Sequence, residues 1–347
     1  MNLIKNIEIK NFKSIRHQKI EGCKRINVFI GYPNVGKSNI LEAIGLYSSF
    51  KLIGERFKFN DICRVKRFSE LFFNKDYRNA TNVTLNEKLL LELVQNKSGD
   101  LEVRITAKSV TESKKDITIY DSTVSAADYE YRDNRTINEP TYKEIVEAIR
   151  KYEFKGDSEI NRKGPLVLSV PFGNNLLDVL HGNSTLRKEI ALLFEDYKQK
   201  LVIDDEEIFF LKYLSDDTGV SIPFHLVADT LRRLIFYKAA ILSNENSILL
   251  FEEPEAHMFP PYIRKFTTDV IFDKSNQFFI NTHSPYVLDA FMEDASDDLA
   301  IYLVYFNKGE TKVKLMSEKD MDEVKEYGVD LFYNLESYLK HGHVNNA

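Results

Sequence analysis

The stretch Gly31-Tyr32-Pro33-Asn34-Val35-Gly36-Lys37-Ser38 fits the pattern G-x-x-x-x-G-K-[ST] of a phosphate-binding P-loop. The run before it, 26–30, is β-branched and aromatic like a buried strand, and the run after it, 38–44, has apolar residues at helical spacing. The alternative is a chance glycine turn before a helix. The order of strand, glycine loop and helix favours the P-loop, and it predicts that the chain binds a nucleoside triphosphate.

Each position of this loop meets a physical need of phosphate binding. Gly31 and Gly36 allow backbone turns that a Cβ would hinder, and they bring N–H groups close to phosphate oxygens. Lys37 is expected to reach the β- and γ-phosphates, and the Ser38 hydroxyl is expected to ligate Mg²⁺. The residues expected to contact the nucleotide are Gly31, Pro33, Asn34, Val35, Gly36, Lys37, Ser38 and Asn39.

The composition is that of an ordinary globular chain. Its 347 residues are 43% hydrophobic and 12% aromatic, which is enough for packed cores and for two or three domains. The first residues alternate apolar and polar side chains like a strand, without a secretory signal, and no stretch reaches the length of a membrane span. We therefore expect a cytoplasmic protein without membrane contact, and we expect Cys23 and Cys63 to be reduced thiols.

The net charge of −6 argues against a protein that coats nucleic acid, although a local basic patch stays possible. The best candidate patch interleaves basic and aromatic residues between positions 56 and 68. Because its basic residues do not follow a groove, we expect a solvated face with the aromatic rings turned inward. The residues of this segment are Arg56, Phe57, Lys58, Phe59, Arg64, Lys66, Arg67 and Phe68.

Three segments differ in character along the chain. Residues 1–125 contain the P-loop and an antiparallel β-meander, 126–220 are expected to form a helical insertion, and 221–347 return to alternating strands and helices. The pattern predicts an α/β fold. Strands are expected at 84–95, 101–107, 116–120, 247–251 and 277–281, and helices at 142–150, 186–201 and 227–242.

Two polar groups follow the buried strands of the last segment. Glu252 and Glu253 follow the run 247–251, where one carboxylate could hold Mg²⁺ through water and the next could orient or deprotonate an attacking water. His283 follows the run 277–281 and could touch a γ-phosphate. The alternatives are an acidic turn and a structural, hydrogen-bonding histidine.

Taken together, the motifs resemble those of OLD-like, RecF- and SMC-related ABC-type ATPases of bacteria. The matching stretches are 9–15, 33–39, 252–257 and 282–285. The resemblance implies an ABC-type P-loop ATPase head, with 1–125 and 221–347 as its N- and C-terminal lobes. It also implies ATP and Mg²⁺ as ligands. Its site residues here are Glu253, His283 and Lys37 as catalytic groups, and Ser38 and Glu252 at the metal.

The resemblance further implies a homodimer or higher homo-oligomer with ATP between subunits. The second subunit would contribute a signature segment, which matches 226–233 here, but Ala228 and Thr230 stand where relatives carry glycines. Glu252 replaces the commoner Asp at the metal position. A bridging glutamine of the family has no clear equivalent here, and the segment 72–74 is only a guess.

OLD nucleases carry a Toprim nuclease domain after the ATPase, and this chain has only about 60 residues after His283. We read its late acids as solvated side chains, so a nuclease or toxin is expected as a separate effector protein, with anti-phage defence as the leading role. A RecF-like DNA-maintenance ATPase and a non-hydrolysing nucleotide-gated scaffold are the alternatives. The late acids are Asp297, Asp298, Asp320 and Asp322.

Overall fold

The computed structural model describes residues 3–52, 58–108, 116–136, 140–158, 160, 164–204, 207–215 and 218–340. It divides the chain into two compact units. The first unit consists of Met1–Lys151, Asn246–Glu253 and Gln277–Ala347, and the second of Tyr152–Glu245 and Pro254–Asn276. The three segments 1–125, 126–220 and 221–347 stay a prediction about domains, because the last of them contributes to both units.

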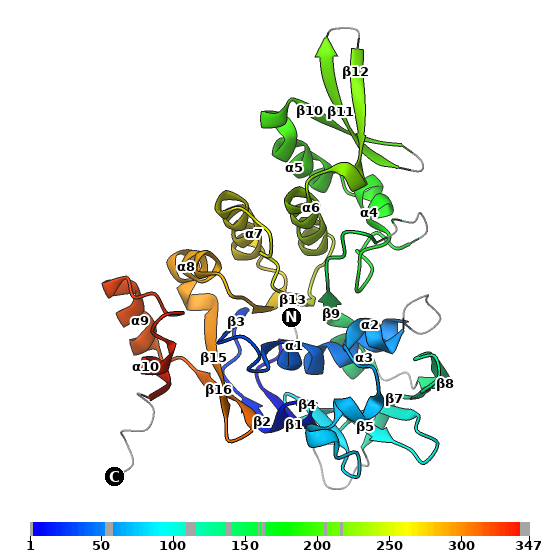
Figure 1. The fold of residues 1–347 in the computed structure, drawn as a ribbon. Coiled ribbons are helices and arrows are strands. Elements are labelled where there is room, and N and C mark those ends of the chain that lie inside the picture. Colours follow the sequence, from blue (N-terminus) through cyan, green and yellow to red (C-terminus); the bar gives the residue numbers. More distant parts are fainter. Residues whose placement is uncertain are drawn as a thin grey trace. The chain divides into compact units, whose positions relative to one another are not determined.

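The first unit contains a six-stranded sheet of order β16-β15-β3-β14-β13-β9 (Figure 1). Strand β3 lies between β14 and β15 and runs parallel to both, and β13 runs parallel to β14. These strands are apolar on both faces because both faces are covered, which confirms the strands expected before the P-loop and at 277–281. The bounds are β3 Ile26–Ile30, β9 Ile149–Tyr152, β13 Ile248–Glu252, β14 Gln277–Asn281, β15 Leu299–Asn307 and β16 Glu310–Leu315.

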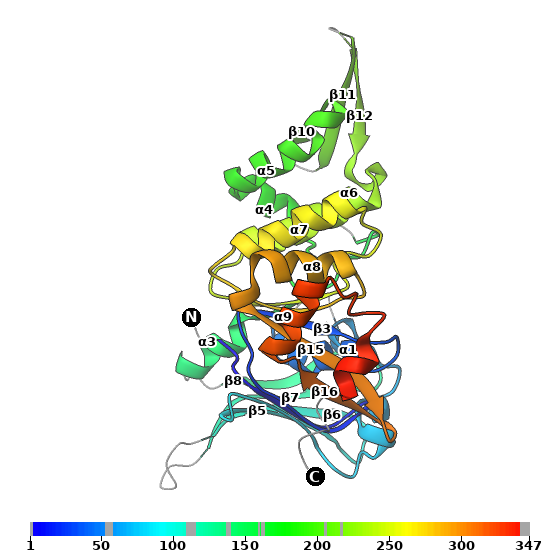
Figure 2. The ribbon, with the colours of Figure 1, turned by 90° about the vertical axis from the view of Figure 1, so that its left-hand side faces the viewer.

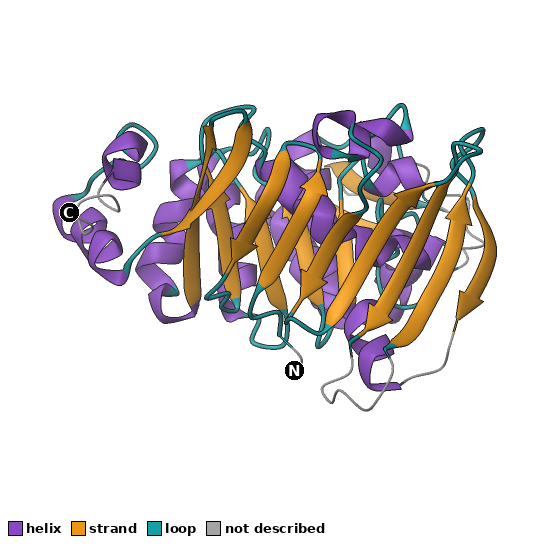
Figure 3. Cartoon of the chain, turned by 90° about the horizontal axis from the view of Figure 1, so that it is seen from below, coloured by secondary structure: helices purple, strands orange, loops and turns teal. Residues whose placement is uncertain are grey.

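A second, antiparallel sheet of the first unit has the order β2-β1-β4-β5-β6-β7-β8, and Figure 3 shows its strands side by side. It confirms the predicted meander, but 84–95 is two strands instead of one. Asn86 and Glu87 take left-handed φ values of 52° and 59°, and this turn reverses the chain between β4 and β5. The bounds are β1 Ile7–Phe12, β2 Ile15–Ile20, β4 Thr81–Leu85, β5 Leu89–Gln95, β6 Leu101–Ala107, β7 Ile117–Val124 and β8 Tyr131–Thr136.

Helix α1 (Lys37–Gly45) packs on β13 and β14 on one side and on β1 on the other, so it lies between the two sheets of this unit. Its apolar side chains join the core that both sheets share. Helix α8 precedes β15 and helix α9 follows β16, and these two helices lie side by side (Figure 2). The other helices of this unit are α2 Phe59–Ile62, α3 Pro140–Ala148, α8 Pro285–Asp294, α9 Glu318–Tyr327 and α10 Leu335–Lys340.

The second unit combines four helices with a three-stranded sheet of order β10-β11-β12. The helix predicted over 186–201 ends at Phe194, because Lys198 takes a left-handed φ of 53° and the chain returns as β10. Phe194 stacks on Phe210 at 3.8 Å between ring centroids and joins the helix to the sheet. The bounds are α4 Leu176–Gly182, α5 Ser184–Phe194, α6 Asp229–Leu242, α7 Pro260–Phe272, β10 Gln199–Ile203, β11 Ile208–Ser215 and β12 Thr218–Pro223.

Two further expectations concern single residues. Phe59 and Phe68 are buried and pack edge to face, with 5.9 Å between their ring centroids. This agrees with the expectation that the aromatic rings of the basic segment turn inward. Arg56 and Phe57 lie outside the described residues. Both cysteines are free thiols. In the described part of the chain, no helix is long and apolar enough to cross a membrane.

Candidate functional site

The glycines of the P-loop are required by close approach of the backbone to its neighbours. A Cβ on Gly31 would lie 2.1 Å from the carbonyl oxygen of Val304 in β15. Gly36 takes φ 99°, and a Cβ there would lie 2.2 Å from Oγ1 of Thr311. The loop therefore lies directly against β15 and β16, and it delivers the N-terminus of α1 to the carboxyl end of β3.

A series of hydrogen bonds holds the P-loop in place. Nδ2 of Asn39 donates to Oγ of Ser14 at 2.7 Å, and the hydroxyls of Ser14 and Thr311 are 2.7 Å apart. Oγ1 of Thr311 then donates to the carbonyl of Val35 at 2.8 Å. Sequence analysis expected Asn39 at the nucleotide and did not find Ser14 or Thr311. Because the hydroxyls of Ser14 and Thr311 each accept one hydrogen bond and donate another, these bonds strengthen one another and hold the loop cooperatively.

Lys37 is almost fully buried, with 5% of its surface exposed. Its Nζ donates to the carbonyl oxygens of Gly31 and Tyr32, both at 2.9 Å. Burial lowers the pKa of Lys37 to about 8, and the nearby Glu253 opposes this shift without cancelling it. The Lys37 ammonium is therefore bound by neutral carbonyl oxygens, which stabilise its charge less than an anion would.

Glu253 stands on a strained backbone held by Asn281. It takes φ 42°, in the left-handed region that residues with a side chain rarely adopt. Its N–H donates to Oδ1 of Asn281 at 2.8 Å and to the carbonyl of the same residue at 3.1 Å. Nδ2 of Asn281 lies 3.5 Å from Oγ of Ser38. One buried amide thus links the carboxylate pair to the P-loop, and no pattern in the sequence had marked it.

Arg64 joins two carboxylates of the site. Its Nη2 lies 2.6 Å from Oε1 of Glu252, and its Nε lies 2.8 Å from Oε1 of the fully buried Glu42 on α1. The Arg64 side chain is 56% exposed, as expected for a solvated basic face, but no pattern in the sequence predicted its pairing with these two carboxylates. Burial alone would raise the pKa of Glu42, but Lys13, Lys151 and Arg64 together hold it below its usual range.

His283 lies beside the second carboxylate. Its Nε2 is 3.4 Å from Oε1 of Glu253. Burial and the charge of Lys37 lower the pKa of His283, and Glu253 opposes them in part. The ring is therefore neutral at neutral pH and can accept or donate one hydrogen bond through Nε2.

These groups surround one cavity of about 410 Å³ in the first unit. The three motifs meet at this cavity, although 30 to 250 positions separate them in the sequence. The motif residues in its lining are Pro33, Asn34, Gly36, Lys37, Ser38, Asn39, Glu253 and His283. Arg64, Glu42, Lys13 and Ser14 complete its lining. The segment 72–74, considered for a bridging glutamine, does not line this cavity.

The oxygen donors present fit Mg²⁺. Oε2 of Glu252 is buried and has no hydrogen-bond partner among the described residues. Glu252 lies opposite Asn281 in the sheet, and the amide of Asn281 approaches the hydroxyl of Ser38. A hydroxyl, a carboxylate oxygen without a partner and substrate phosphates are ligands that Mg²⁺ uses in nucleotide sites, where few protein ligands suffice.

The signature-like segment begins α6 in the second unit. Thr230, which replaces an expected glycine, donates from Oγ1 to the carbonyl of His257 at 2.7 Å. Asp229 pairs with Arg232 at 3.3 Å and with Arg233 at 3.8 Å. The substituted hydroxyl is thus engaged within its own unit.

The mixed sheet, the P-loop before α1, the antiparallel second sheet and the carboxylates at the end of β13 are the arrangement of an ABC-type ATPase head. The comparison with protein families agrees with this class. Residues 26–289 match the family described as "AAA domain, putative AbiEii toxin, Type IV TA system", and the chain belongs to it.

Curated relatives match only short parts of the chain. The DNA replication and repair protein RecF of Thermoanaerobacter sp. is 37% identical over 70 residues, which are 20% of this chain and 18% of that protein. An ATP/GTP phosphatase of Helicobacter pylori is 45% identical over 42 residues, 12% of this chain and 11% of that protein. The chain thus matches less than a fifth of the length of either relative.

Among solved structures, similarity extends over nearly the whole chain. A crystal structure of an Smc head bound to the C-winged helix domain of ScpA superposes with a TM-score of 0.51 and 14% identity. The superposition covers 92% of this chain and 99% of that one. At this identity the likeness concerns the fold.

Proposed function

We propose that this chain binds ATP with Mg²⁺ at the P-loop cavity and hydrolyses it, and that it uses the nucleotide to control a partner protein. One observation carries the proposal. Lys37, Ser38, Glu253 and His283 line one cavity at the carboxyl ends of β3, β13 and β14, and Glu252 pairs with Arg64, which lines it too. In α/β sheets this edge is where ligands bind.

The chemistry of the chain's own residues follows from their positions. Loop N–H groups and Lys37 would hold the β- and γ-phosphates, and Ser38 and Glu252 would hold Mg²⁺, which neutralises phosphate charge when bound. Glu253 would take the proton of the attacking water, and the neutral His283 would hydrogen-bond the γ-phosphate. Arg64 pairs with Oε1 of Glu252, which leaves Oε2 for the metal.

A direct assay tests this function. The purified chain should release phosphate from ATP only when Mg²⁺ is present, and EDTA should abolish the release without abolishing the fold. A chain that neither binds nor hydrolyses ATP would remove the proposal. A chain that binds ATP without turnover would be the nucleotide-gated scaffold.

We also propose that ATP joins two copies of the chain. The support is the resemblance of 226–233 to a signature segment, which in ABC-type ATPases faces the nucleotide of the other subunit. Since Ala228 and Thr230 replace glycines there, we expect Asp229, Arg232, Arg233 or the N-terminus of α6 to make the contact. Mass measured in solution with and without ATP should show a monomer-to-dimer shift.

The proposed partner is a separate effector, a nuclease or a toxin, in bacterial defence against phage. The family description, which names a putative toxin of a toxin–antitoxin system, supports an association of this fold with such systems. Co-purification of a neighbour-encoded protein with the tagged chain, together with a change in phage sensitivity, is the expected result. Absence of both would count against the role.

The match to RecF supports a second candidate, an ATPase clamped on DNA. It predicts ATP-dependent binding of duplex DNA that weakens steeply with salt, because each phosphate contact releases counterions. Anisotropy of a labelled duplex across salt concentrations decides the matter. No ATP-dependent binding would exclude this candidate.

The buried lysine predicts that ATP binding takes up a proton. Phosphate favours charged Lys37, whereas its pKa in the empty site is about 8. We therefore expect uptake of about 0.1 proton per ATP at pH 7, about 0.5 at pH 8 and about 0.9 at pH 9, with affinity falling above pH 8. Calorimetry in buffers of different ionisation enthalpy measures the number. Lys37→Arg, which stays charged, is the control and should show no uptake at any of these pH values.

Asn281 predicts a second effect, on turnover. Asn281→Ala removes the Oδ1 acceptor of the Glu253 N–H and the amide near Ser38, so the strained carboxylate loses its position. We expect kcat to fall about tenfold, with ATP affinity changed by less than about threefold. Equal losses in kcat and binding, with a lowered melting temperature, would instead mean that the amide only stabilises the fold.

A further inference from the structure

A second cavity, of about 270 Å³, lies wholly within the second unit, and no residue of the P-loop motifs lines it. The segment after β9, the end of β12 and helix α6 contribute its walls. Its walls combine aromatic rings with basic groups and one acidic side chain, Glu207. The aromatic and basic residues are Phe154, Phe172, Phe224, Phe236, Lys155, His225 and Arg232.

Arg232 is the most informative of these side chains. Only 15% of it is exposed. Its Nη1 donates to the carbonyl of Gly156 at 2.6 Å, and its Nη2 lies 3.3 Å from Oδ1 of Asp229. Its Nε is buried and has no acceptor among the described residues. A buried guanidinium N–H without an acceptor is unfavourable, and an anionic oxygen is the acceptor that matches it best.

The remaining walls suit a flat apolar body. Phe154 and Phe236 pack edge to face, with 5.7 Å between their ring centroids. Nζ of Lys155 lies 3.5 Å from the ring centroid of Phe172, so a second positive charge stands over an aromatic face. Aromatic walls with a few convergent polar groups are typical of small-molecule sites.

We propose that this cavity binds a small molecule with a planar apolar body of one or two rings and one anionic group. The anion, a carboxylate, sulfonate or phosphate, would accept from Arg232, and the rings would pack among the phenylalanines. At about 270 Å³ the cavity is slightly smaller than the usual range of ligand sites, about 300 to 1,000 Å³, which limits the body to this size. Such a ligand would contact the first turn of α6 through Arg232.

The probe for this site is 5-(dimethylamino)naphthalene-1-sulfonate, an anionic dye of two fused rings whose fluorescence rises in apolar surroundings. Titration of the full chain should give saturable binding of one dye per chain. Indole-3-acetate, which has both features, should displace it, whereas indole and acetate, which have one each, should not at the same concentration. The titration is done without nucleotide, because the proposed dimer would bring the ATP of the other copy to this same first turn of α6.

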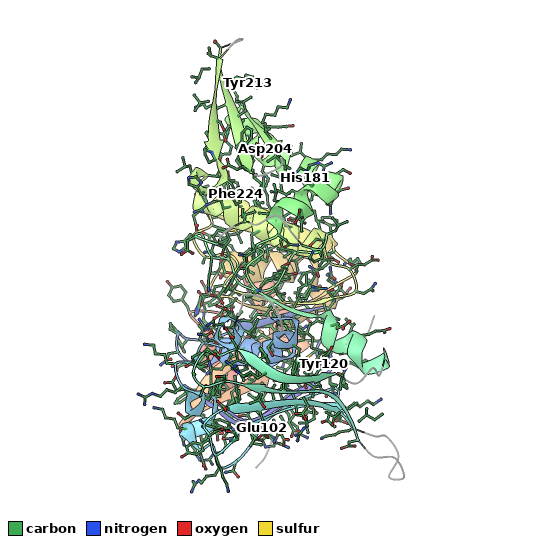
Figure 4. The ribbon with its side chains drawn as sticks, turned by 90° about the vertical axis from the view of Figure 1, so that its right-hand side faces the viewer. Glu102, Tyr120, His181, Asp204, Tyr213 and Phe224 are labelled. Atoms are coloured by element: carbon green, nitrogen blue, oxygen red, sulfur yellow. The ribbon has the colours of Figure 1, made fainter. Side chains whose placement is uncertain are left out.

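Variants locate the dye. Arg232→Gln should weaken its binding about tenfold or more through loss of a charge-assisted hydrogen bond, and Arg232→Lys should weaken it less. Phe224→Ala, at the base of the β11–β12 hairpin, should weaken it as well, while Tyr213→Ala, near the hairpin tip, is the matched control and should not (Figure 4). If Arg232→Gln does not fold, the affinity of Phe224→Ala for the dye and the displacement of the dye by indole-3-acetate still test whether the dye occupies this cavity.

Three outcomes would overturn the proposal. They are the absence of saturable binding, equal affinity of the native chain and a folded Arg232→Gln variant, and displacement by indole as effective as that by indole-3-acetate. A loss confined to Tyr213→Ala would likewise place the dye on the exposed hairpin and remove the site.

Discussion

Glu253→Gln is expected to bind ATP with Mg²⁺ as the native chain does, and to hydrolyse it about 10² to 10⁴ times more slowly. Glutamine keeps the size of the side chain but cannot accept a proton from water at neutral pH. The side chain is about half exposed at the cavity, where water can reach it, and Oε1 lies 3.4 Å from His283. Single-turnover phosphate release, with Kd measured separately, distinguishes chemistry from binding.

The matched control is Glu102→Gln, which makes the same chemical change on β6, outside the cavity (Figure 4). It should hydrolyse ATP at the native rate. If Glu253→Gln and the native chain have equal, near-zero rates while both bind ATP, the chain is a nucleotide-gated scaffold. If the native chain is active and Glu253→Gln retains full activity, another group is the base.

The same variant tests the proposed dimer. When hydrolysis is blocked and binding is retained, the ATP-bound state accumulates. Glu253→Gln with ATP should therefore be dimeric at protein concentrations where the native chain, once its ATP is consumed, is monomeric. A variant that stays monomeric at saturating ATP would contradict a nucleotide-joined dimer, even if its turnover falls as expected.

The sequence predicted those parts of the site that consist of short contiguous patterns. The P-loop, the carboxylates after β13 and the histidine after β14 each have a strand before them, and parallel strands bring their carboxyl ends to one edge. Placing these strands side by side was enough to bring Lys37, Glu253 and His283 together. The family match over residues 26–289 and the superposition on an Smc head agree with the predicted class of fold.

The supporting groups could not be predicted because they act across large separations. Asn281 contacts Ser38 from 243 positions away, Thr311 reaches Val35 over 276, and Arg64 reaches Glu252 over 188. Each of these residues has the look of an ordinary polar residue in its local sequence. Only the register of the sheets and the course of the chain after α1 place them beside the motifs.

The predicted element boundaries are wrong where residues with a left-handed φ reverse the direction of the chain. The apolar spacing of 84–95 continues through Asn86 and Glu87, and that of 186–201 continues through Lys198. All three residues take a left-handed φ, which Asn adopts readily but Glu and Lys do not. Periodicity reports which side chains are buried, and it does not report where the backbone turns.

Lys37→Met is expected to lose ATP binding by about 100-fold or more while the free energy of unfolding at pH 7 is unchanged or higher. Loss of a charge-assisted contact to phosphate accounts for the binding. The stability follows from the lowered pKa of Lys37, about 8 against 10.5, because a charged lysine in the empty site costs about 3 kcal/mol. Loss of hydrogen bonds to the carbonyls of Gly31 and Tyr32 offsets about 1 to 2 kcal/mol of that gain.

The lowered pKa of Lys37 also determines how the stability difference between the two proteins changes with pH. Between the folded pKa of about 8 and the unfolded value of 10.5, the unfolded chain binds more protons at Lys37, so native stability rises with pH through this group. The advantage of Lys37→Met over the native chain should therefore be greatest at pH 7 and shrink by about 1.4 kcal/mol per pH unit above pH 8. Urea unfolding of both proteins at pH 7, 8 and 9 without nucleotide measures it. A native chain more stable than Lys37→Met at pH 7, by an amount that does not change with pH, would mean that Lys37 stabilises the empty loop. The predicted result would mean that the loop is held ready for phosphate at the expense of stability.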